Sequence, residues 1–226
     1  FIVAVKIFSV HAYQGETMVE QCGATFAICM MLLLIYLSAN IGWKFNYDNR
    51  HSLMHEQGFL CAYCMRRIPQ KGRIPSATIE HWDPQSQTDT TKALDYKNML
   101  AVCNGNRGSE VRYLTCDAKK QSTAIRVNPL NPATLKTICY QSDGTIYSED
   151  ANINTDLNVT LNLNCNRFGL VDSRRDALQR MLKELQAKHS SGDIKRYCAK
   201  LLNAYRENSP KTPYVGILIQ WLERHC

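Results

Sequence analysis

Four cysteines in the middle of the chain have the spacing of a zinc site. Cys61 and Cys64 form a Cys-x-x-Cys pair, and two thiolates at this spacing can bind one tetrahedral zinc ion from a tight turn. Zinc needs a second pair of ligands, and Cys103 and Cys116 are the next cysteines along the chain. We therefore predict a closed structural Zn2+ site with four thiolate ligands. The alternative is that Cys61 and Cys64 are only buried or redox-active thiols.

Polar residues between and beside these cysteines follow the order strand, loop, strand, helix. Residues 78–81 favour a strand that a nearby proline ends, so Glu80 and His81 fall at the strand end, where side chains can converge on a substrate. Asn98 lies in a polar loop that leads into an apolar second strand. Asp117 then lies at the start of a short helix. The pattern predicts a small site built by a hairpin and a helix.

These motifs resemble those of the HNH (ββα-metal) endonuclease superfamily, and more narrowly are similar to the HNH proteins of Septu and retron anti-phage systems. The resemblance covers roughly residues 50–185. It implies an α+β fold with a zinc-stabilised, treble-clef-like ββα-metal core, a helical C-terminal region and an N-terminal apolar helix. The shared motifs are Gln57, Cys61-Ala62-Tyr63-Cys64, Ile79-Glu80-His81-Trp82, Tyr96-Lys97-Asn98-Met99-Leu100, Cys116-Asp117-x-x-Lys120 and Asn128-Pro129.

The resemblance gives a role to each polar residue of the motifs. His81 corresponds to the general base that draws a proton from water, and an imidazole suits this task because its ordinary pKa of about 6.5 lies near working pH. Glu80 and Asp117 take the positions that bind the catalytic divalent ion. Asn98 corresponds to the asparagine that braces the loop and orients His81. The resemblance therefore implies a site that hydrolyses phosphodiester bonds.

Two departures from the family pattern bear on the catalytic ion. The last motif position is usually asparagine or histidine, and here it is Asp117. Two carboxylates make a harder oxygen site, which favours Mg2+ or Mn2+ over zinc. Glu80 is one methylene longer than the more common aspartate. If Glu80 is instead a salt-bridge partner, we expect Asp117, water and the substrate phosphate to hold the ion.

Basic side chains near the motifs are candidate phosphate contacts. The chain has 27 Lys and Arg residues against 20 Asp and Glu, which allows a polyanionic partner without requiring one. Some of the candidates follow the Cys-x-x-Cys pair, and the resemblance adds the two lysines after Asp117. The candidates are Arg66, Arg67, Lys71, Arg73, Lys119 and Lys120. Arg174 and other basic residues of the C-terminal helices have two interpretations that the sequence leaves open: they contact phosphates, or they form a solvent-exposed helix face.

The N-terminal region, residues 1–46, contains an uncharged apolar stretch over residues 22–43. Its length approaches that of a membrane span, but polar residues such as Asn40 dilute it, and acidic residues precede it where a signal peptide has basic ones. Several interpretations stay open. We favour a helix buried at a partner interface, and the others are a core helix, a membrane anchor and an unreliably assigned stretch of sequence.

The rest of the chain divides into a predicted core, residues 47–127, and an extension, residues 128–226. In the core a short helix precedes the first cysteine. The extension is expected to contain a hairpin turning at Ser142-Asp143-Gly144, a strand or extended segment where apolar and polar residues alternate, and three helices. The ranges are 47–57 for the first helix, 137–147 for the hairpin and 157–163 for the alternating segment. Of the three later helices, the first begins at residue 172 and the others cover residues 193–207 and 213–224.

The other cysteines do not resemble a disulfide framework. Of the 10 cysteines in the chain, those outside the proposed zinc site are scattered singly. We therefore expect ordinary thiols at these positions, among them Cys198 and Cys226, and a reducing compartment, the cytoplasm.

The sequence and the resemblance together lead to two functional hypotheses. The first is a metal-dependent HNH endonuclease that acts as the effector of an anti-phage complex with an ATPase partner. DNA is its favoured substrate, and RNA or transfer RNA is the alternative. The second is a zinc module that binds nucleic acid or scaffolds a complex without catalysis. Retention of His81, Asn98 and Asp117 together favours the first, because a scaffold needs only the cysteines.

Overall fold

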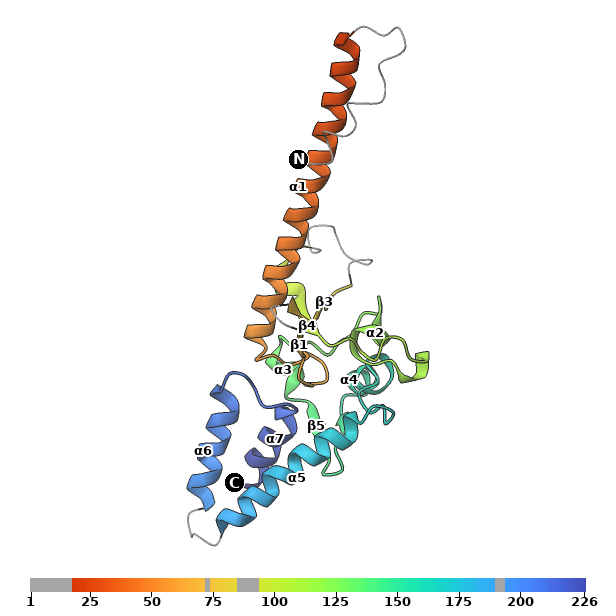
Figure 1. The fold of residues 1–226 in the computed structure, drawn as a ribbon. Coiled ribbons are helices and arrows are strands. Elements are labelled where there is room, and N and C mark those ends of the chain that lie inside the picture. The colour runs from red at the N-terminus through yellow and green to blue at the C-terminus, as the bar shows by residue number, and fades with distance from the viewer. Residues whose placement is uncertain (1–17, 72–73, 85–93, 190–193) are drawn as a thin grey trace. The chain divides into compact units, whose positions relative to one another are not determined.

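The structure is a computed structural model that describes the backbone of residues 18–71, 74–84, 94–189 and 194–226. Two of the predicted phosphate contacts, Lys71 and Arg73, lie outside the described side chains. The chain divides into two units, residues 1–46 and residues 47–226. Together the described elements form an α+β fold that is mostly helical and has small hairpin sheets, which confirms the predicted fold class at this level (Figure 1).

The first unit contains most of helix α1 (Met18–Glu56). Its side chains are described for residues 28–38, and all of them are exposed, including the apolar run from Met30 to Leu37. Within the part of the chain that the structure describes, no helix is long and apolar enough to span a membrane. The partner interface favoured for this segment stays a prediction.

The second unit begins with the last turns of α1, which contain the short helix expected over residues 47–57. Gly58 follows the helix with a φ of +58°, the left-handed conformation that commonly ends a helix. A Cβ atom at this position would lie 2.3 Å from Cγ of Lys211, so the close approach of the two segments also requires glycine. The end of α1 thus delivers the chain to the first cysteine pair.

Strands β3 (Thr78–His81) and β4 (Met99–Val102) form the predicted antiparallel hairpin, in which Glu80 pairs with Leu100 and His81 with Met99. A single 3-10 turn, η4 (Tyr96–Asn98), leads directly into β4. All four residues of β4 are buried, so this strand is the centre of the core around the cysteines. After a loop with a second 3-10 turn, η5 (Val111–Tyr113), comes the short helix α2 (Cys116–Lys120).

Two further hairpins and short helices complete the sheet part. Strands β5 (Ile138–Tyr140) and β6 (Ile146–Ser148) pair as predicted around Gly144, whose φ is +92°. A Cβ atom on Gly144 would lie 2.2 Å from the carbonyl oxygen of Val171, so the turn packs directly on helix α5 (Leu170–His189). The remaining short elements are β1 (Gln70–Lys71), β2 (Ile74–Pro75), α3 (Pro132–Leu135) and α4 (Ala151–Thr155).

The strand or extended segment expected over residues 157–163 is wrong. Helix α4, capped by Asp150, continues into a π-helical turn, η6 (Asp156–Thr160). Leu157 and Leu161 are buried while Val159 is 63% exposed, although a strand would place all three on one face. Burial at a spacing of four residues is the helical pattern.

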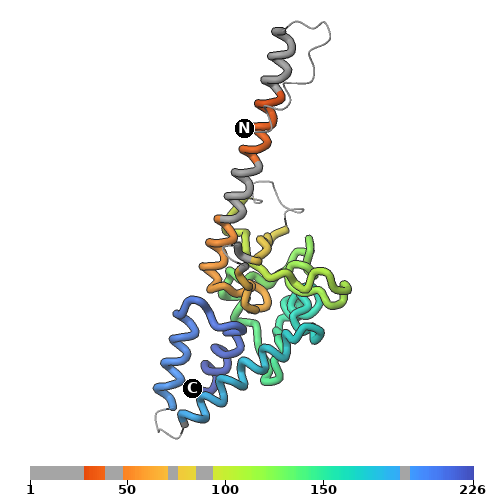
Figure 2. Tube along the Cα trace, viewed as in Figure 1, coloured from red at the N-terminus to blue at the C-terminus, as the bar shows by residue number. Residues whose placement is uncertain are grey.

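Helices α5 (Leu170–His189), α6 (Ile194–Glu207) and α7 (Val215–His225) pack against one another as a C-terminal bundle (Figure 2). Cys198 on α6 forms a disulfide with Cys226, the residue after α7. The expectation of ordinary thiols at these two positions is therefore wrong, because the α6–α7 packing brings together cysteines that the sequence shows far apart. Arg174, considered as a phosphate contact, is buried and donates hydrogen bonds to the carbonyl oxygens of Gly144 and Leu163.

The bundle and the cysteine region belong to one unit. Gln220 on α7 accepts a hydrogen bond from the backbone N–H of Tyr140 at 2.8 Å and donates one to the carbonyl of Ile138 at 2.8 Å. The N–H of Tyr214 donates to the carbonyl of Met65, just after the first cysteine pair, at 3.0 Å. One continuous core therefore extends on both sides of the boundary expected between residues 127 and 128.

Candidate metal centre

The four predicted cysteines meet in one buried cluster. Cys61 and Cys64 come from the turn that follows α1, Cys103 follows β4, and Cys116 opens α2. Their sulfur atoms all lie within 4.8 Å of one another. The prediction that these residues, distant in sequence, form one site is confirmed, and the cluster joins the hairpin to α2.

The separations of the sulfur atoms fit a tetrahedral zinc ion. The Sγ atoms of Cys61 and Cys116 are 3.9 Å apart, and those of Cys64 and Cys103, and of Cys103 and Cys116, are 3.8 Å apart. A tetrahedron with Zn–S bonds of about 2.3 Å has edges of about 3.8 Å. Disulfide bonds are far shorter, about 2.05 Å. The cluster can therefore bind a structural Zn2+ ion.

The electrostatics of the cluster also call for a cation. Hydrogen bonds from the thiols of Cys116, Cys61 and Cys64 lower the pKa of Cys103, so one thiolate is stabilised by its neighbours. The pKa of Cys64 is raised, first by its interaction with Cys103, and that of Cys116 is raised for the same reason. Further thiolates in this buried space repel one another unless a divalent ion neutralises them.

Backbone and side-chain hydrogen bonds hold the cysteine segments in place. Gln57 donates through Nε2 to the carbonyl of Ala101 at 2.7 Å and accepts at Oε1 from the N–H of the same residue at 2.8 Å, so it ties the end of α1 to β4. The N–H of Thr115 donates to the carbonyl of Gly105 at 2.9 Å, and a Cβ atom on Gly105 would lie 2.2 Å from the Thr115 carbonyl oxygen. Glycine therefore lets the loop close on α2.

Asn98 fixes the segment that follows His81. Its Nδ2 donates to the carbonyl of Asp83 at 3.0 Å, its Oδ1 accepts from the N–H of Asp83 at 2.8 Å, and its backbone carbonyl accepts from the N–H of Trp82 at 3.0 Å. Asn98 is buried, and its side-chain hydrogen bonds with Asp83 are partly buried. This is the position expected for a residue that braces the loop after His81.

Glu80 lies in a buried polar cluster between β3 and α2. Its carboxylate forms an ion pair with Nζ of Lys120 at 2.7 Å and accepts a hydrogen bond from the hydroxyl of Tyr63 at 3.2 Å. Burial and the neighbouring carboxyl group of Asp117 raise the pKa of Glu80 to about 7, while Lys120 acts to lower it. Burial and the Glu80 charge also raise the pKa of Tyr63. Glu80 is thus the salt-bridge partner considered as an alternative, and it lies beside Asp117.

Asp117 in the first turn of α2 forms an ion pair with Arg107 from the preceding loop. The Asp117 side chain is only 12% exposed, whereas that of Arg107 is 56% exposed. Arg107 is a residue that the sequence reasoning did not assign to the site. The sequence feature that could have identified Arg107 is its position in the Asn104–Ser109 loop, between two cysteine ligands.

His81 ends β3 and is half-buried, and its backbone carbonyl accepts a hydrogen bond from Nζ of Lys120 at 3.3 Å. Successive side chains of a strand leave on opposite faces, so His81 departs from the face opposite to Glu80. Among the described residues, only the four cysteines form a cluster of three or more candidate metal ligands. His81 therefore does not join Glu80 and Asp117 in such a cluster, although a general base need not be a ligand.

The four candidate phosphate contacts whose side chains the structure describes have different surroundings. Lys120 is not a surface contact, because its side chain is fully buried in the ion pair with Glu80. Arg67 donates to the carbonyls of Gly58 and Lys211, which gives it a structural task. Arg66, whose guanidinium donates to the carbonyl of Phe168 at 3.2 Å, and Lys119, which donates to the carbonyl of Val111 at 3.3 Å, are half-buried.

Neither the known protein families nor the curated proteins give a match to the chain. The metal centre must be interpreted from its own residues.

Proposed function

We propose that the protein is a metal-dependent HNH endonuclease that hydrolyses phosphodiester bonds of nucleic acid, with DNA favoured over RNA. The proposal is carried by the carboxyl groups of Glu80, near the end of β3, and Asp117, in the first turn of α2, which interact with each other. Two carboxyl groups brought together from separate elements are what a hard divalent ion requires, whereas a structural zinc module has no need of them. The strand, strand, helix order around the cysteine cluster also fits the ββα-metal core.

The proposal gives each side chain a task. His81 accepts the proton of the attacking water, the new O–P bond forms, and the bond from phosphorus to the 3′ oxygen breaks with a proton from solvent. Asn98 holds the segment behind His81. Asp117, with Glu80 beside it, is the ligand for Mg2+ or Mn2+. Such an ion, when bound, supplies the positive charge that stabilises the negative charge growing on phosphate oxygens.

The resemblance to anti-phage HNH proteins extends the proposal to a complex. An HNH core contains little recognition machinery of its own, so we propose that an ATPase partner controls the nuclease within a hetero-oligomer. The exposed apolar residues 28–38 of α1 are compatible with such an interface. The partner is accessible to experiment by purification of the tagged full-length chain from its native host, with and without ATP.

A second candidate function is a zinc module that binds nucleic acid or scaffolds a complex without catalysis. One observation favours it: each carboxylate of the proposed catalytic pair already has a cationic partner, Lys120 for Glu80 and Arg107 for Asp117. A scaffold would use these ion pairs only to hold α2 against β3.

Cleavage of supercoiled plasmid by the full-length chain, alone and with its co-purifying proteins, separates the two functions. In the presence of Mg2+ or Mn2+ we expect nicking by the parent protein and a loss of roughly 100-fold or more in His81→Ala, since general base catalysis contributes about that much. His225→Ala, which changes an exposed histidine at the end of α7, is the matched control. Zinc content and folding should be unchanged in both variants.

The same assay has clear contrary outcomes. If His81→Ala cuts as fast as the parent, His81 is not the base. If the parent binds DNA but does not cut it with any divalent metal or any partner, the scaffold function replaces the nuclease.

A further inference from the structure

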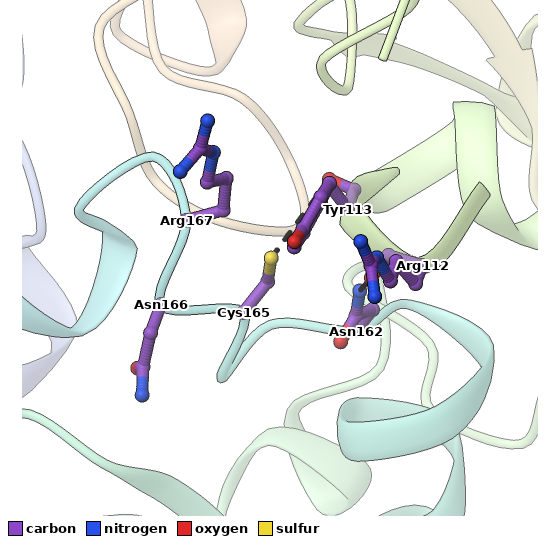
Figure 3. A pocket seen from close by; sticks show the side chains of 6 residues that line it. All are labelled: Arg112, Tyr113, Asn162, Cys165, Asn166 and Arg167. Atoms are coloured by element: carbon purple, nitrogen blue, oxygen red, sulfur yellow. Dashed lines mark hydrogen bonds between the residues drawn. The ribbon is translucent and has the colours of Figure 1, made fainter. Parts of the chain in front are cut away.

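A pocket of about 440 Å³ lies on the surface between the loop that precedes α2 and the turn that precedes α5. Figure 3 shows the side chains of Arg112 and Arg167 on either side of the Tyr113 side chain, with Cys165 between the two segments. Its volume is within the range of sites that take small ligands or single groups of larger ones. The pocket is lined by Arg112, Tyr113, Asn162, Cys165, Asn166 and Arg167.

Hydrogen bonds between the two segments fix the walls of this pocket. Nδ2 of Asn162, whose φ is +52°, donates to the carbonyls of Arg112 at 3.0 Å and Leu114 at 2.8 Å. The Cys165 thiol donates to the carbonyl of Tyr113 at 3.8 Å. These contacts hold η5 against the 162–167 turn, so the pocket is pre-formed.

The pocket carries positive charge on an aromatic platform. The guanidinium carbon of Arg112 lies 4.8 Å from the Tyr113 ring centroid, and that of Arg167 lies 5.5 Å from the same centroid. Arg112 also pairs with Glu110 at 2.9 Å, but both side chains are about two-thirds exposed, at 68% and 65%, so solvent screens this pair. Within the described part of the chain, no carboxylate lies within ion-pair distance of Arg167.

We propose that this pocket is a phosphate-binding site for a nucleic-acid strand. A guanidinium stacked on a ring is already oriented, and its N–H edge stays available to donate to a phosphate in the fork geometry that arginine prefers. Two such groups around one ring offer several N–H donors to the oxygens of one phosphodiester group. The inference rests on the proposed function, because it supplies that nuclease with a contact for its substrate.

The position of the pocket suits this task. Tyr113 precedes the first residue of α2 by only a short stretch, and Lys119 of α2 donates to the carbonyl of Val111 at 3.3 Å, which ties η5 to that helix. The N–H of Cys116 donates to the carbonyl of Leu161 at 2.9 Å, so the second wall is joined to the metal centre as well. Arg112 and Tyr113 thus lie only a short stretch before Asp117 in the sequence.

DNA binding without added divalent metal tests the site. The fluorescence anisotropy of a short labelled duplex is measured with the full-length parent and with the variants Arg112→Gln and Arg167→Gln, over a range of salt concentrations. We expect each variant to bind about fivefold more weakly at low salt, with a salt dependence of log K less steep by about 0.9 for each lost phosphate contact. Arg126→Gln, which changes an exposed arginine outside the pocket, should match the parent.

A second arm distinguishes a nucleic-acid strand from a free nucleotide. A deoxynucleoside monophosphate is titrated into the parent and into Arg167→Gln. Weak binding of the monophosphate, at millimolar concentration, supports the strand. If the monophosphate binds at micromolar concentration through Arg167 while DNA binding is the same in both proteins, the pocket serves free nucleotides and the inference is overturned.

The outcomes also separate this inference from the nuclease proposal. If the parent cleaves plasmid but Arg112→Gln and Arg167→Gln bind DNA with its affinity and salt dependence, the pocket has no part in strand binding and the nuclease stands. If both variants lose affinity and the parent cuts under no condition, the phosphate site stands and the nuclease does not.

Discussion

The buried ion pair between Lys120 and Glu80 gives the sharpest prediction about the stability of the site. Nζ of Lys120 lies 2.7 Å from the carboxylate, and the two side chains are 0% and 7% exposed. The substitution Lys120→Met removes the charge and keeps an unbranched side chain of similar length. It leaves Glu80 buried beside Asp117 with Tyr63 as a neutral hydrogen-bond donor. We expect the free energy of unfolding to fall.

The size of the loss follows from the geometry. At 2.7 Å and an effective dielectric constant of about 20, the attraction between the two charges is about 6 kcal/mol. Part of this only offsets the cost of burying them, and removal of one partner of a buried pair typically costs about 3–5 kcal/mol. Because Glu80 can take up a proton, we expect a smaller loss, about 2–3 kcal/mol near pH 7.

The loss should grow as the pH rises. Burial and Asp117 raise the pKa of folded Glu80 from its ordinary 4.5 to about 7, and without Lys120 it rises further. A carboxyl group with a raised folded pKa binds more protons in the folded state, so stability falls as the pH rises toward that value. In the parent this fall ends near pH 7. In Lys120→Met it continues at up to about 1.4 kcal/mol per pH unit, which adds about 2 kcal/mol by about pH 8.5.

Urea unfolding followed by tryptophan fluorescence, at a fixed zinc concentration and without magnesium, measures both effects. Lys119→Met removes the neighbouring lysine, whose side chain has no carboxylate partner among the described residues. It should lose no more than about 1 kcal/mol, the contribution of its hydrogen bond to the Val111 carbonyl, with no added pH dependence. The double variant Glu80→Gln with Lys120→Met should lose the extra pH dependence. If Lys120→Met is no less stable than Lys119→Met at either pH, the pair does not hold α2 against β3.

Two further predictions concern the residues that hold the site together. Cys116→Ser should release zinc and lower the midpoint of unfolding relative to the parent, because structural zinc contributes directly to the free energy of folding. Metal analysis and circular dichroism measure this, and normal folding with no bound zinc would contradict the four-cysteine site. Asn98→Ala should destabilise the chain by about 1–3 kcal/mol, because the N–H and carbonyl of Asp83 lose their hydrogen-bond partner. It should also reduce plasmid cleavage by at least about tenfold. If the variant cleaves plasmid as fast as the parent, the hydrogen bonds of Asn98 are not needed for catalysis.

The features that sequence alone could predict are those in which chemistry restricts the partners. A Cys-x-x-Cys pair needs two more ligands, and Cys103 and Cys116 could be selected because they are the next two cysteines along the chain. The β3–β4 hairpin was also within reach, because a buried strand such as Met99–Val102 is uninterrupted by polar residues. The segment over 157–163 was not, since alternation over so few residues fits a helical turn as well, and only the exposure of Val159 decides between them.

The partners of the acidic residues could not be predicted from sequence. From the sequence alone, a metal ion, Lys119 and Lys120 are equally good partners for Glu80, because long side chains leave several partners within range. The structure selects Lys120, which lies one helical turn after Asp117 and so shares the face of α2 that meets β3. The disulfide between Cys198 and Cys226 had the same difficulty, because pairing depends on the packing of α6 and α7.

The charges around the proposed catalytic ion define what must change when it binds. Glu80 and Asp117 are balanced by Lys120 and Arg107, so the cluster is close to neutral when both acidic groups are ionised. A divalent ion added to this cluster would bring an excess of positive charge. Lys120 has no route to solvent because its side chain is fully buried, whereas Arg107 is 56% exposed and lies in a loop. Under the proposed function, binding of the ion therefore requires Arg107 to leave Asp117, and the ion pair with Lys120 remains as the fixed support of the site.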